Sequence, residues 1–343
     1  MSDACLGCDR GAMGLGDGVF DLRAIGVVLA GSVWFGGVGG GWCAGDLGSS
    51  VRLLRFGACR IALCGGPFHG QPKAKGQPMK EFYAGKSVVI TGASSGIGRD
   101  LAVLLASYGS RVALVARRVA LLEEVKNECE RAGGEALVLG GDVTDVESMN
   151  RVRDEVVAKW GQADIVVANA GAGGLNPGDN FSLDVHRRVV EINCIGMANT
   201  LMPFVPSMVE RRDGRLVGVS SLAAFRGLPN AASYSSTKAA QMVFLESLRV
   251  DLRKHGVSVS CIHPGFVESA MTEHDEFRMP FMMKTRASSL LIAKAIKKRK
   301  ASYLYPWPMR VLTCINRMLP RAVYDRLVPS LSGMKGKVEP RIF

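Results

Sequence analysis

The sequence predicts an α/β protein with a doubly wound parallel sheet, and three observations carry this prediction. Short apolar, β-branched runs recur along the chain, at 87–91, 111–116, 136–139, 164–168, 215–219 and 257–262. Helical patterns of apolar residues separate these runs, and the first comprises Leu101, Leu104, Leu105 and Tyr108. A glycine-rich turn, 91–98, follows the first run. Near-continuous apolar strands that alternate with helices are typical of a three-layer protein whose parallel sheet is covered on both faces.

Composition excludes several classes of protein. The 343 residues are 48% apolar and 22% charged, which is enough apolar material for a packed core and too little charge for a disordered chain. The formal net charge is +12, and 15 basic but only 2 acidic residues fall within 278–343. The rest of the chain is close to neutral. We therefore expect no nucleic-acid partner, and the basic C-terminal segment needs its own explanation.

The nine cysteines are scattered without the paired spacing of a disulfide framework. Free thiols suit a reducing compartment, so we expect a cytoplasmic protein. Cys5 and Cys8 form a short pair, but no second pair follows at ligand spacing. No histidine forms a metal-binding helix motif with a neighbouring glutamate. We therefore expect no metal.

The first 78 residues differ from the rest, because they hold 19 of the 41 glycines without any period. Residues 24–45 carry no charge and are long enough to cross a bilayer, but eight of these positions are glycine, which weakens a helix. The stretch before them lacks the net positive charge of a secretory signal. We expect 1–78 to be a disordered extension, or upstream sequence that is not normally translated. The compact α/β domain is expected to span 79–343.

A glycine-rich turn joins the first expected strand to the first helix. Its sequence, Thr91-Gly-Ala-Ser-Ser-Gly-Ile-Gly98, spaces three glycines where the backbone must turn tightly. The helix that begins there points its N–H groups and the positive end of its dipole at whatever the turn holds. This strand–turn–helix context predicts a Rossmann-type dinucleotide site. We expect the cofactor to contact Gly92, Ser94, Ser95, Gly96, Ile97 and Gly98.

The residues after the second strand indicate which dinucleotide binds. An NAD site has an acidic side chain at this point for the ribose hydroxyls, but this chain has Ala116 followed by Arg117 and Arg118. A guanidinium suits a 2′-phosphate, so we expect NADP(H) rather than NAD(H), with Arg117 as the phosphate ligand. We expect Arg118 only to solvate the start of the next helix.

Further cofactor contacts are expected after the third and fourth strands. Asp142, with Val143 beside it, follows the third strand, where its carboxylate is placed to accept from the adenine amino group. Small residues after the fourth strand let the cofactor lie against the strand end, and these are Asn169, Ala170 and Gly171. Ligands of such sheets bind at the carboxyl ends of the strands, so all of these residues join one predicted site.

A phenol and an ammonium group share one helix face at Tyr234 and Lys238, four residues apart. A free phenol has a pKa of about 10, and a nearby lysine and an oxidised nicotinamide both favour its ionised form. Lys238 is also placed to hold the nicotinamide ribose. Ser221, at the end of the fifth strand, is placed to donate to the substrate oxygen. Asn193 is placed to hold a water that links Lys238 to solvent.

Together these motifs resemble the short-chain dehydrogenase/reductase family. The matching segments cover roughly residues 80–270 in the family's order, and they are TGASSGIG at 91–98, DV at 142–143, NAG at 169–171, Asn193, Ser221, YSSTK at 234–238 and PG at 264–265. The resemblance implies a nicotinamide-dependent oxidoreductase in which Tyr234 is the acid/base and Lys238 lowers its pKa. It also implies that Ser221 orients the substrate and that Asn193 belongs to the proton relay.

The resemblance extends to the end of the sixth strand. It implies that Pro264, Val267 and Ser269 flank the nicotinamide amide, with Gly265 beside them. Two features depart from the family's pattern. Ala168 precedes the NAG segment where many members have a second asparagine. The chain also has no glycine-rich final strand of the kind that builds a tetramer in many bacterial members. We expect a homodimer.

The segment 266–343 is expected to supply a substrate loop and basic amphipathic helices. Residues 287–300 predict a helix that begins at Ser288 and Ser289, and 303–308 predict a short strand and a turn. Apolar stripes with arginines opposite them continue to 331. Three explanations of 287–331 stay open: helices that cover the substrate pocket, peripheral contact with an anionic membrane, or docking of an acidic carrier or coenzyme A substrate.

The expected substrate loop, 266–286, is rich in methionine and phenylalanine. Adaptable apolar side chains favour a lipophilic carbonyl or alcohol as the substrate. A 3-oxoacyl thioester is the alternative substrate. Two other functions are weighed, a catalytically weak NADP(H)-binding scaffold and a membrane-surface adaptor. The complete set of Asn193, Ser221, Tyr234 and Lys238 argues against both.

Overall fold

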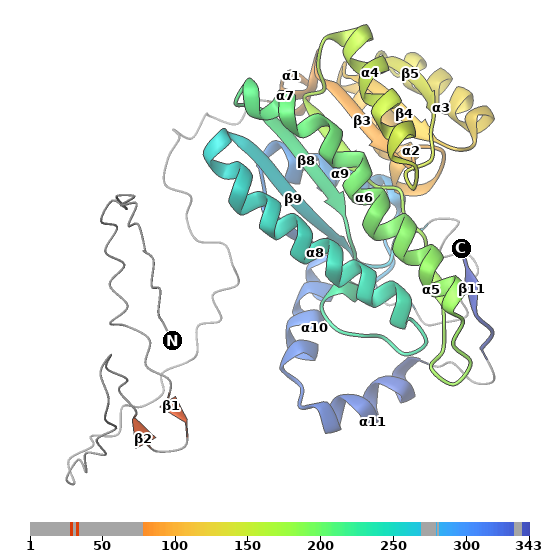
Figure 1. Ribbon diagram of the computed structural model, residues 1–343, viewed down its shortest axis with the longest axis vertical. Coiled ribbons are helices and arrows are strands. Elements are labelled where there is room, and N and C mark those ends of the chain that lie inside the picture. The colour runs from red at the N-terminus through yellow and green to blue at the C-terminus, as the bar shows by residue number, and fades with distance from the viewer. Residues whose placement is uncertain (1–27, 30–31, 34–77, 269–278, 280, 333–337) are drawn as a thin grey trace, which may run out of the picture. The chain divides into compact units, whose positions relative to one another are not determined.

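The computed structural model describes residues 28–29, 32–33, 78–268, 279, 281–332 and 338–343 (Figure 1). The chain divides into two compact units, Met1–Gln71 and Pro72–Phe343. In the first unit the described residues form one antiparallel pair, β1 (Val28–Leu29) with β2 (Ser32–Val33). The second unit holds the remaining elements. Ser269 and much of the expected substrate loop lie outside the described residues.

Seven parallel strands form the central sheet, in the order β10-β9-β8-β6-β3-β4-β5. Their bounds are β3 (Ser87–Thr91), β4 (Arg111–Ala116), β5 (Glu135–Gly140), β6 (Ile165–Ala168), β8 (Gly214–Val219), β9 (Val257–Pro264) and β10 (Ser302–Tyr305). The chain starts the sheet at β3, builds outward through β4 and β5, and then returns to the other side of β3 with β6. The predicted doubly wound parallel sheet is confirmed.

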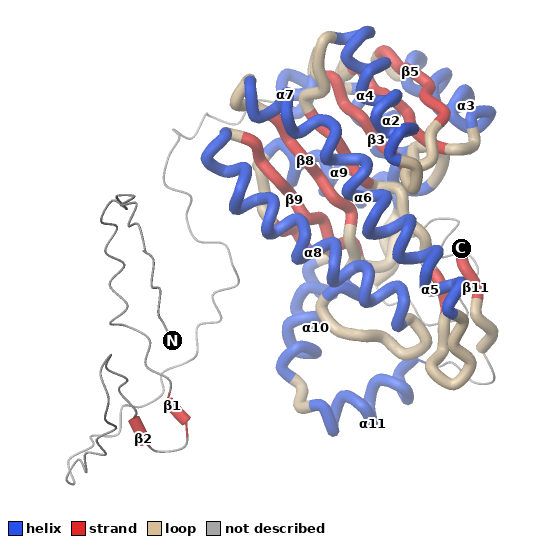
Figure 2. The backbone as a smooth tube through the Cα atoms, viewed as in Figure 1, coloured by secondary structure: helices blue, strands red, loops and turns tan. Residues whose placement is uncertain are grey.

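Helices cover both faces of the sheet (Figure 2). One face holds α1 (Met79–Tyr83), α2 (Gly96–Ser107), α3 (Val119–Arg131) and α9 (Thr285–Lys297). The other holds α4 (Val146–Trp160), α6 (Gly196–Leu201), α7 (Val205–Glu210) and α8 (Ala232–Leu252). Along β3, Val88 and Ile90 pack into the first core and Val89 into the second. Both sides of the central strands are buried, which explains their continuous apolar sequences.

A continuous helical run, Leu183–Glu210, crosses one face of the sheet. It comprises α5 (Leu183–Val190), the π-helical turn η1 (Glu191–Ile195), α6, the 3-10 turn η2 (Met202–Phe204) and α7. Within the described residues, this run alone has the length and mean hydropathy that a membrane span requires. Met197, Leu201 and Phe204 from the run are buried against the sheet. A core helix of an α/β protein meets the same two criteria, so length and composition alone do not make it a membrane segment.

The C-terminal elements divide between core and surface. α9 begins at Thr285, and not at the serines expected to start it, because Ser288 and Ser289 are buried within the helix. Ser288 Oγ lies 2.8 Å from the Tyr305 hydroxyl, which fixes α9 to β10. α10 (Trp307–Met318) and α11 (Arg321–Ser332) extend below the sheet in Figure 1. Finally, β11 (Arg341–Ile342) pairs antiparallel with β7 (Gly174–Leu175).

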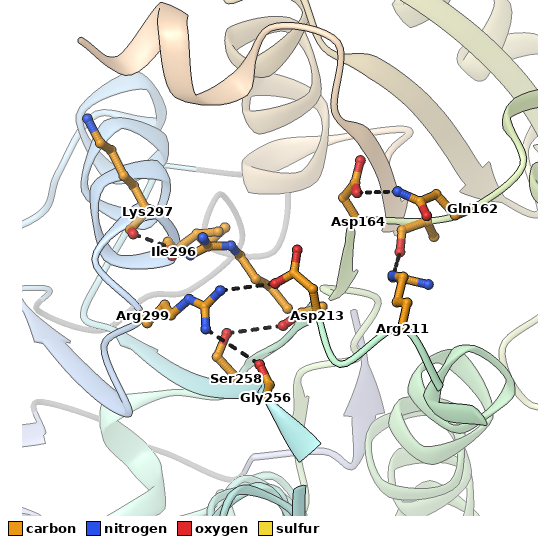
Figure 3. A network of polar contacts seen from close by, with 12 residues as sticks. Gln162, Asp164, Arg211, Asp213, Gly256, Ser258, Ile296, Lys297 and Arg299 are labelled. Atoms are coloured by element: carbon orange, nitrogen blue, oxygen red, sulfur yellow. Dashed lines mark hydrogen bonds and ion pairs between the residues drawn. The ribbon is translucent and has the colours of Figure 1, made fainter. Parts of the chain in front are cut away.

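Polar contacts tie together the loops at the amino-terminal edge of the sheet (Figure 3). Arg299 donates to Asp213 Oδ1 at 3.0 Å, just before β8 begins. Arg215 donates to the Ile296 carbonyl at 2.8 Å and so fixes the end of α9. Gln162 donates to Asp164 Oδ1 at 2.8 Å, just before β6. This edge is therefore occupied by structural contacts, and the predicted site lies at the opposite, carboxyl edge.

Candidate active site

The glycine turn connects β3 to α2 at the carboxyl edge of the sheet. Gly92 and Gly96 have φ values of 68° and 54°, a left-handed backbone that glycine adopts without strain. α2 begins at Gly96, and its N-cap Ser95 makes no side-chain hydrogen bond to the first turn. The N–H groups of that turn therefore lack a side-chain cap, and together with the helix dipole they suit an anion. Ser94 is buried beside the turn and Ile97 packs against the core, and the pyrophosphate contact of the turn stays a prediction.

Close packing fixes this turn to the end of β6. A Cβ at Gly98 would lie 2.3 Å from the Gly92 carbonyl oxygen, so only glycine fits there. Asn169 Nδ2 donates to the carbonyls of Thr91 at 3.0 Å and Gly92 at 3.3 Å. Thr91 Oγ1 accepts from the backbone amides of Asn169 at 3.2 Å and Ala170 at 3.3 Å. Thr91, the last residue of its strand, thus shapes the site, although it is not among the residues predicted to contact the cofactor.

Arg117 and Arg118 follow β4 and have different partners. Arg117 Nη1 lies 3.9 Å from Asp142 Oδ2, beside the carboxylate predicted to meet the adenine. Arg118 Nη2 donates to Ser94 Oγ at 3.0 Å and to Ser95 Oγ at 3.2 Å. The expectation that Arg118 only solvates the start of α3 is therefore wrong, because its guanidinium reaches the glycine turn. Both arginines border the predicted cofactor site.

Asp142 remains ionised near neutral pH. Burial alone would raise its pKa, but hydrogen bonds from Thr144 N and Oγ1, both at 2.9 Å, and the charge of Arg117 outweigh burial and lower the pKa. The carboxylate is thus an acceptor suited to an adenine amino group. The side chain of Val143 instead belongs to the core, and its carbonyl accepts from Asn199 at 2.9 Å. A contact between Val143 and the cofactor stays a prediction.

The π-helical turn η1 positions Asn193. Such single-turn insertions occur frequently at functional sites. Asn193 Oδ1 accepts from the Ala172 amide at 2.8 Å, and its Nδ2 donates to the Ala172 carbonyl and to Thr237 Oγ1, both at 3.0 Å. Gln241 donates to the Asn193 carbonyl at 2.6 Å. The side chain therefore joins the segment after β6 to α8, and the water link expected of it stays a prediction.

Tyr234 and Lys238 lie on the first turns of α8. Lys238 Nζ lies 5.5 Å from the centre of the Tyr234 ring and donates to the Val219 carbonyl at 3.1 Å. The lysine is 5% exposed, and this burial lowers its pKa to about 8. A Cβ at Gly171 would lie 3.5 Å from Lys238 Nζ and 3.2 Å from Asn193 Oδ1. The structure therefore brings Tyr234, Lys238 and Asn193 together at the carboxyl ends of β6 and β8, and their catalytic roles stay predictions.

Ser221 follows the end of β8 and begins the short helix η3 (Leu222–Ala224). Its Oγ accepts from the Ala223 amide at 3.1 Å, which leaves the hydroxyl proton for donation to another oxygen. The adjacent Ser220 donates to the Lys238 carbonyl at 2.9 Å. Ser220 thus ties the strand end that carries Ser221 to the helix that carries Tyr234.

The sequence does not single out His263, although it directly precedes the predicted Pro264–Gly265 pair. The side chain is fully buried, its Nδ1 lies 3.3 Å from the Ser221 carbonyl, and its ring packs against Phe225. A carbonyl only accepts, so we assign the imidazole proton to Nδ1. Among the described residues Nε2 has no hydrogen-bond partner. Burial lowers the pKa of His263 to about 4, so the ring is neutral at physiological pH.

The predicted nicotinamide segment lies at the same edge. Pro264 ends β9, and the Gly265 amide donates to the Tyr305 carbonyl at 2.8 Å. Val267 is buried and pairs with Met283. Both ends of the substrate loop are thereby fixed beside the site. Ser269, the last predicted contact, lies outside the described residues.

Comparison with known proteins agrees with this geometry. A family model described as short chain dehydrogenase matches residues 86–278. The chain belongs to the short-chain dehydrogenase family. An uncharacterized oxidoreductase of Myxococcus xanthus is 43% identical over 241 residues, which are 70% of this chain and 95% of that protein. A fatty acyl-CoA reductase of Acinetobacter baylyi is 28% identical over 244 residues, which are 70% of this chain and 79% of that protein.

The fold of this short-chain dehydrogenase is also similar to solved structures. The crystal structure of a short chain dehydrogenase/reductase from Burkholderia phymatum in complex with NAD has a TM-score of 0.63 at 23% identity. The match covers 68% of this chain and 93% of that chain, and at this identity it shows the fold. The family match makes the protein an oxidoreductase that uses a nicotinamide cofactor. No group of three or more potential metal-binding side chains occurs within the part of the chain that the structure describes.

Proposed function

We propose that this short-chain dehydrogenase is an NADP(H)-dependent oxidoreductase that transfers a hydride between the nicotinamide and a lipophilic carbonyl or alcohol substrate. The observation that carries the proposal is the buried ammonium of Lys238, 5.5 Å from the Tyr234 ring. Burying a charge is costly, and a buried cation with a lowered pKa beside a phenol is characteristic of a catalytic site. Asn193 and Ser221 border the same place.

Each of these residues has a role in moving a proton at the substrate oxygen. In carbonyl reduction Tyr234 donates its hydroxyl proton to that oxygen, and in alcohol oxidation the phenolate takes it back. Lys238 stabilises the phenolate and keeps its charge below about pH 8. Ser221 donates a second hydrogen bond to the same oxygen, and Asn193 belongs to the relay that returns the proton from solvent. The nicotinamide, when bound, supplies or takes up the hydride.

The preference for NADP(H) over NAD(H) rests on the end of β4. Ala116 offers no carboxylate to ribose hydroxyls. Two arginines follow, and Arg117 lies beside the carboxylate of Asp142. Among the described residues Arg118 contacts only the neutral hydroxyls of Ser94 and Ser95, so one positive charge is left over. The surplus charge suits a 2′-phosphate, which accepts paired hydrogen bonds from a guanidinium.

A lipophilic substrate is supported by the residues that border the site. Phe281 and Met282 are 56% and 44% exposed at the end of the substrate loop, where Met283 fixes the loop to Val267. Flexible thioether side chains adapt to apolar ligands. The name of the Acinetobacter baylyi relative, a fatty acyl-CoA reductase, is consistent with this class and also favours the second candidate, a 3-oxoacyl thioester.

The proposed partners follow from the surface. Exposed apolar side chains gather on two neighbouring helical elements, Ile195 and Met202 on the run through α6, and Val243 and Val250 on α8. We propose that a second copy of the chain covers them in a homodimer. We also propose a cytoplasmic protein whose 287–331 segment contacts an anionic membrane peripherally.

A panel of carbonyls and alcohols, followed by the change in NADPH absorbance with the purified protein, tests this function. We expect turnover of apolar members of the panel, with NADPH or NADP⁺ preferred over NADH or NAD⁺. The catalytically weak scaffold predicts NADPH binding without turnover of any member. Turnover with NADH and NAD⁺ only would contradict the assigned cofactor.

A further inference from the structure

α10 presents its apolar side to solvent. Trp307 is 77% exposed and Met318 67%, and Val311 and Ile315 between them are 48% and 53% exposed. Their spacing along the helix places these four side chains on one face. Met309 is the one buried residue of α10. On α11 the exposed apolar residues continue with Val323 and Leu327. We call the four α10 residues with Val323 and Leu327 the outer face.

α9 differs from α10, because its apolar side is buried. α9 has a similar sequence of apolar and basic residues, but Ile292, Ala295 and Ile296 are buried in the core that also contains α2. A soluble helix normally turns its apolar side inward, as α9 does. A contiguous apolar patch on the surface instead marks a site of interaction with a protein or a membrane.

Basic side chains flank the outer face. Arg310 is three residues after Trp307 and Arg317 directly precedes Met318, and both arginines are exposed on α10. A cleft of about 430 Å³ opens where α10 meets α11, and it is lined by Phe225, Arg226, Arg317, Leu319, Pro320 and Arg321. Within the described residues, no ion pair joins Arg310, Arg317 or Arg321 to a carboxylate. In the part of the chain that the structure describes, these three positive charges therefore have no ion-pair partner.

The junction of α10 and α11 is held by Arg226. Its guanidinium donates to the carbonyls of Asn316 and of Leu319, the latter at 2.9 Å, and so caps the end of α10. The same guanidinium stacks on the Tyr324 ring at 3.8 Å, and the Tyr324 hydroxyl donates to the Gly227 carbonyl. Arg226 thus fixes the end of α10 to α11.

The same junction borders the catalytic residues. Phe225, next to Arg226, contacts the Arg317 guanidinium at 5.5 Å and the His263 ring at 4.8 Å. His263 in turn contacts the Ser221 carbonyl. Phe225 and His263 therefore lie between Arg317, which flanks the outer face, and Ser221.

We propose that the outer face docks on an anionic lipid bilayer, with the apolar stripe in the interface and the arginines on lipid phosphates. An anionic bilayer offers both apolar and negatively charged groups, which complement both features of the face. A second copy on this face would bring the same uncompensated arginines together. Phe225 and His263 link Arg317, which flanks the outer face, to Ser221. By this route the lipophilic substrate enters from the bilayer, and this second part rests on the proposed function.

Co-sedimentation of the full chain with vesicles tests the docking without any measurement of turnover. Vesicles of phosphatidylcholine with phosphatidylserine are compared with vesicles of phosphatidylcholine alone, at low and at physiological salt. We expect binding to the anionic vesicles that weakens with salt, and little binding to the neutral ones. The absence of sedimentation with anionic vesicles even at low salt would overturn the proposal.

Matched variants assign the binding to the outer face. Val311→Ser with Ile315→Ser is compared with Val146→Ser and Val157→Ser, which are 49% and 39% exposed on α4. Arg310→Gln with Arg317→Gln is compared with Arg131→Gln and Arg151→Gln, which remove the same charge on α3 and α4. We expect the outer-face variants to lower the vesicle partition coefficient by about tenfold or more and the controls to change it less than about twofold.

Residues 24–45 are the same in all of these proteins, so any binding through them leaves no difference between test and control variants. Equal binding of test and control variants would therefore overturn the proposal. Self-association that Val311→Ser with Ile315→Ser abolishes, without vesicle binding, would overturn it in favour of a protein partner.

Substrate entry is tested separately, with a long-chain aldehyde in anionic vesicles and a short aldehyde in water. We expect Val311→Ser with Ile315→Ser to lower the rate of reduction of the long-chain aldehyde by about tenfold and to leave the rate with the short aldehyde unchanged. Equal loss on both would overturn the entry route. If the unaltered protein reduces neither aldehyde, the proposed substrate fails with its entry route, while the sedimentation result on docking stands.

Discussion

The guanidinium of Arg118 crosses from the end of β4 to the glycine turn and donates to Ser94 Oγ at 3.0 Å. Its neighbour Arg117 instead lies 3.9 Å from Asp142, with 62% of its side chain exposed. Two adjacent arginines therefore have distinct partners. Arg118 holds the glycine turn, and Arg117 is the exposed guanidinium that we propose as the partner of a 2′-phosphate.

This difference predicts distinct effects on cofactor binding. Arg117→Ala should weaken NADPH binding by about tenfold or more and NADH binding little, because it removes a phosphate partner. Arg118→Ala should weaken both cofactors, because the glycine turn loses its two serine contacts. Fluorescence titration with each cofactor measures these affinities, and Arg131→Ala on α3 is the control. Equal losses of NADPH and NADH affinity in Arg117→Ala would show that this side chain does not contact the 2′-phosphate.

His263 should make stability depend on pH. Burial lowers its pKa from 6.5 to about 4, so the unfolded chain takes up a proton between these values while the folded protein does not. The free energy of unfolding should therefore be unaffected by this group above about pH 6.5 and should fall by on the order of 3 kcal/mol as the pH drops to about 4. Urea unfolding of the protein and of His263→Gln, compared from pH 7 to about pH 4, measures the difference. A constant difference across this range would contradict the buried neutral imidazole.

Asn193→Ala should lower both stability and turnover. The change leaves the amide and carbonyl of Ala172 without their side-chain partners in the interior, which we expect to cost roughly 3 kcal/mol. Turnover should fall further than the loss of folded protein explains, because the segment after β6 borders Lys238. Asn199→Ala, which removes one hydrogen bond to the Val143 carbonyl, is the control. Full turnover in Asn193→Ala would remove Asn193 from the proposed relay.

Residues 79–343 should fold and act without the first 78. The described core, from Tyr83 to Met309, involves no residue before Met79. We expect this fragment to unfold cooperatively and to match the turnover of the full chain within about twofold. Thermal unfolding and the NADPH assay measure both properties. Loss of folding on truncation would make the glycine-rich segment part of the domain.

The strands were predictable because burial on two faces leaves a strong local signal. Ser87–Thr91 and Arg111–Ala116 have the expected bounds, since a short apolar, β-branched run between two turns fits a buried strand and is too short for a helix. The start of α9 was not predictable from the sequence, because serines favour helix starts. Only tertiary packing shows that Ser288 lies within the helix and bonds to Tyr305. The contact of His263 with Ser221 and the contact of Arg118 with the glycine turn were not predictable either, because residues distant in sequence set the direction of a single side chain. Periodicity also cannot show whether an apolar helix face is covered, so α9 and α10 look alike in sequence.

Turnover by Tyr234→Phe tests the central claim most directly, because the phenol is the one group assigned to exchange a proton with the substrate oxygen. The variant keeps the ring beside Lys238 and removes only the hydroxyl. We expect NADPH binding to stay within about twofold of the unaltered protein while turnover falls by about a thousandfold or more. Turnover near that of the unaltered protein, on any substrate that it accepts, would contradict the account.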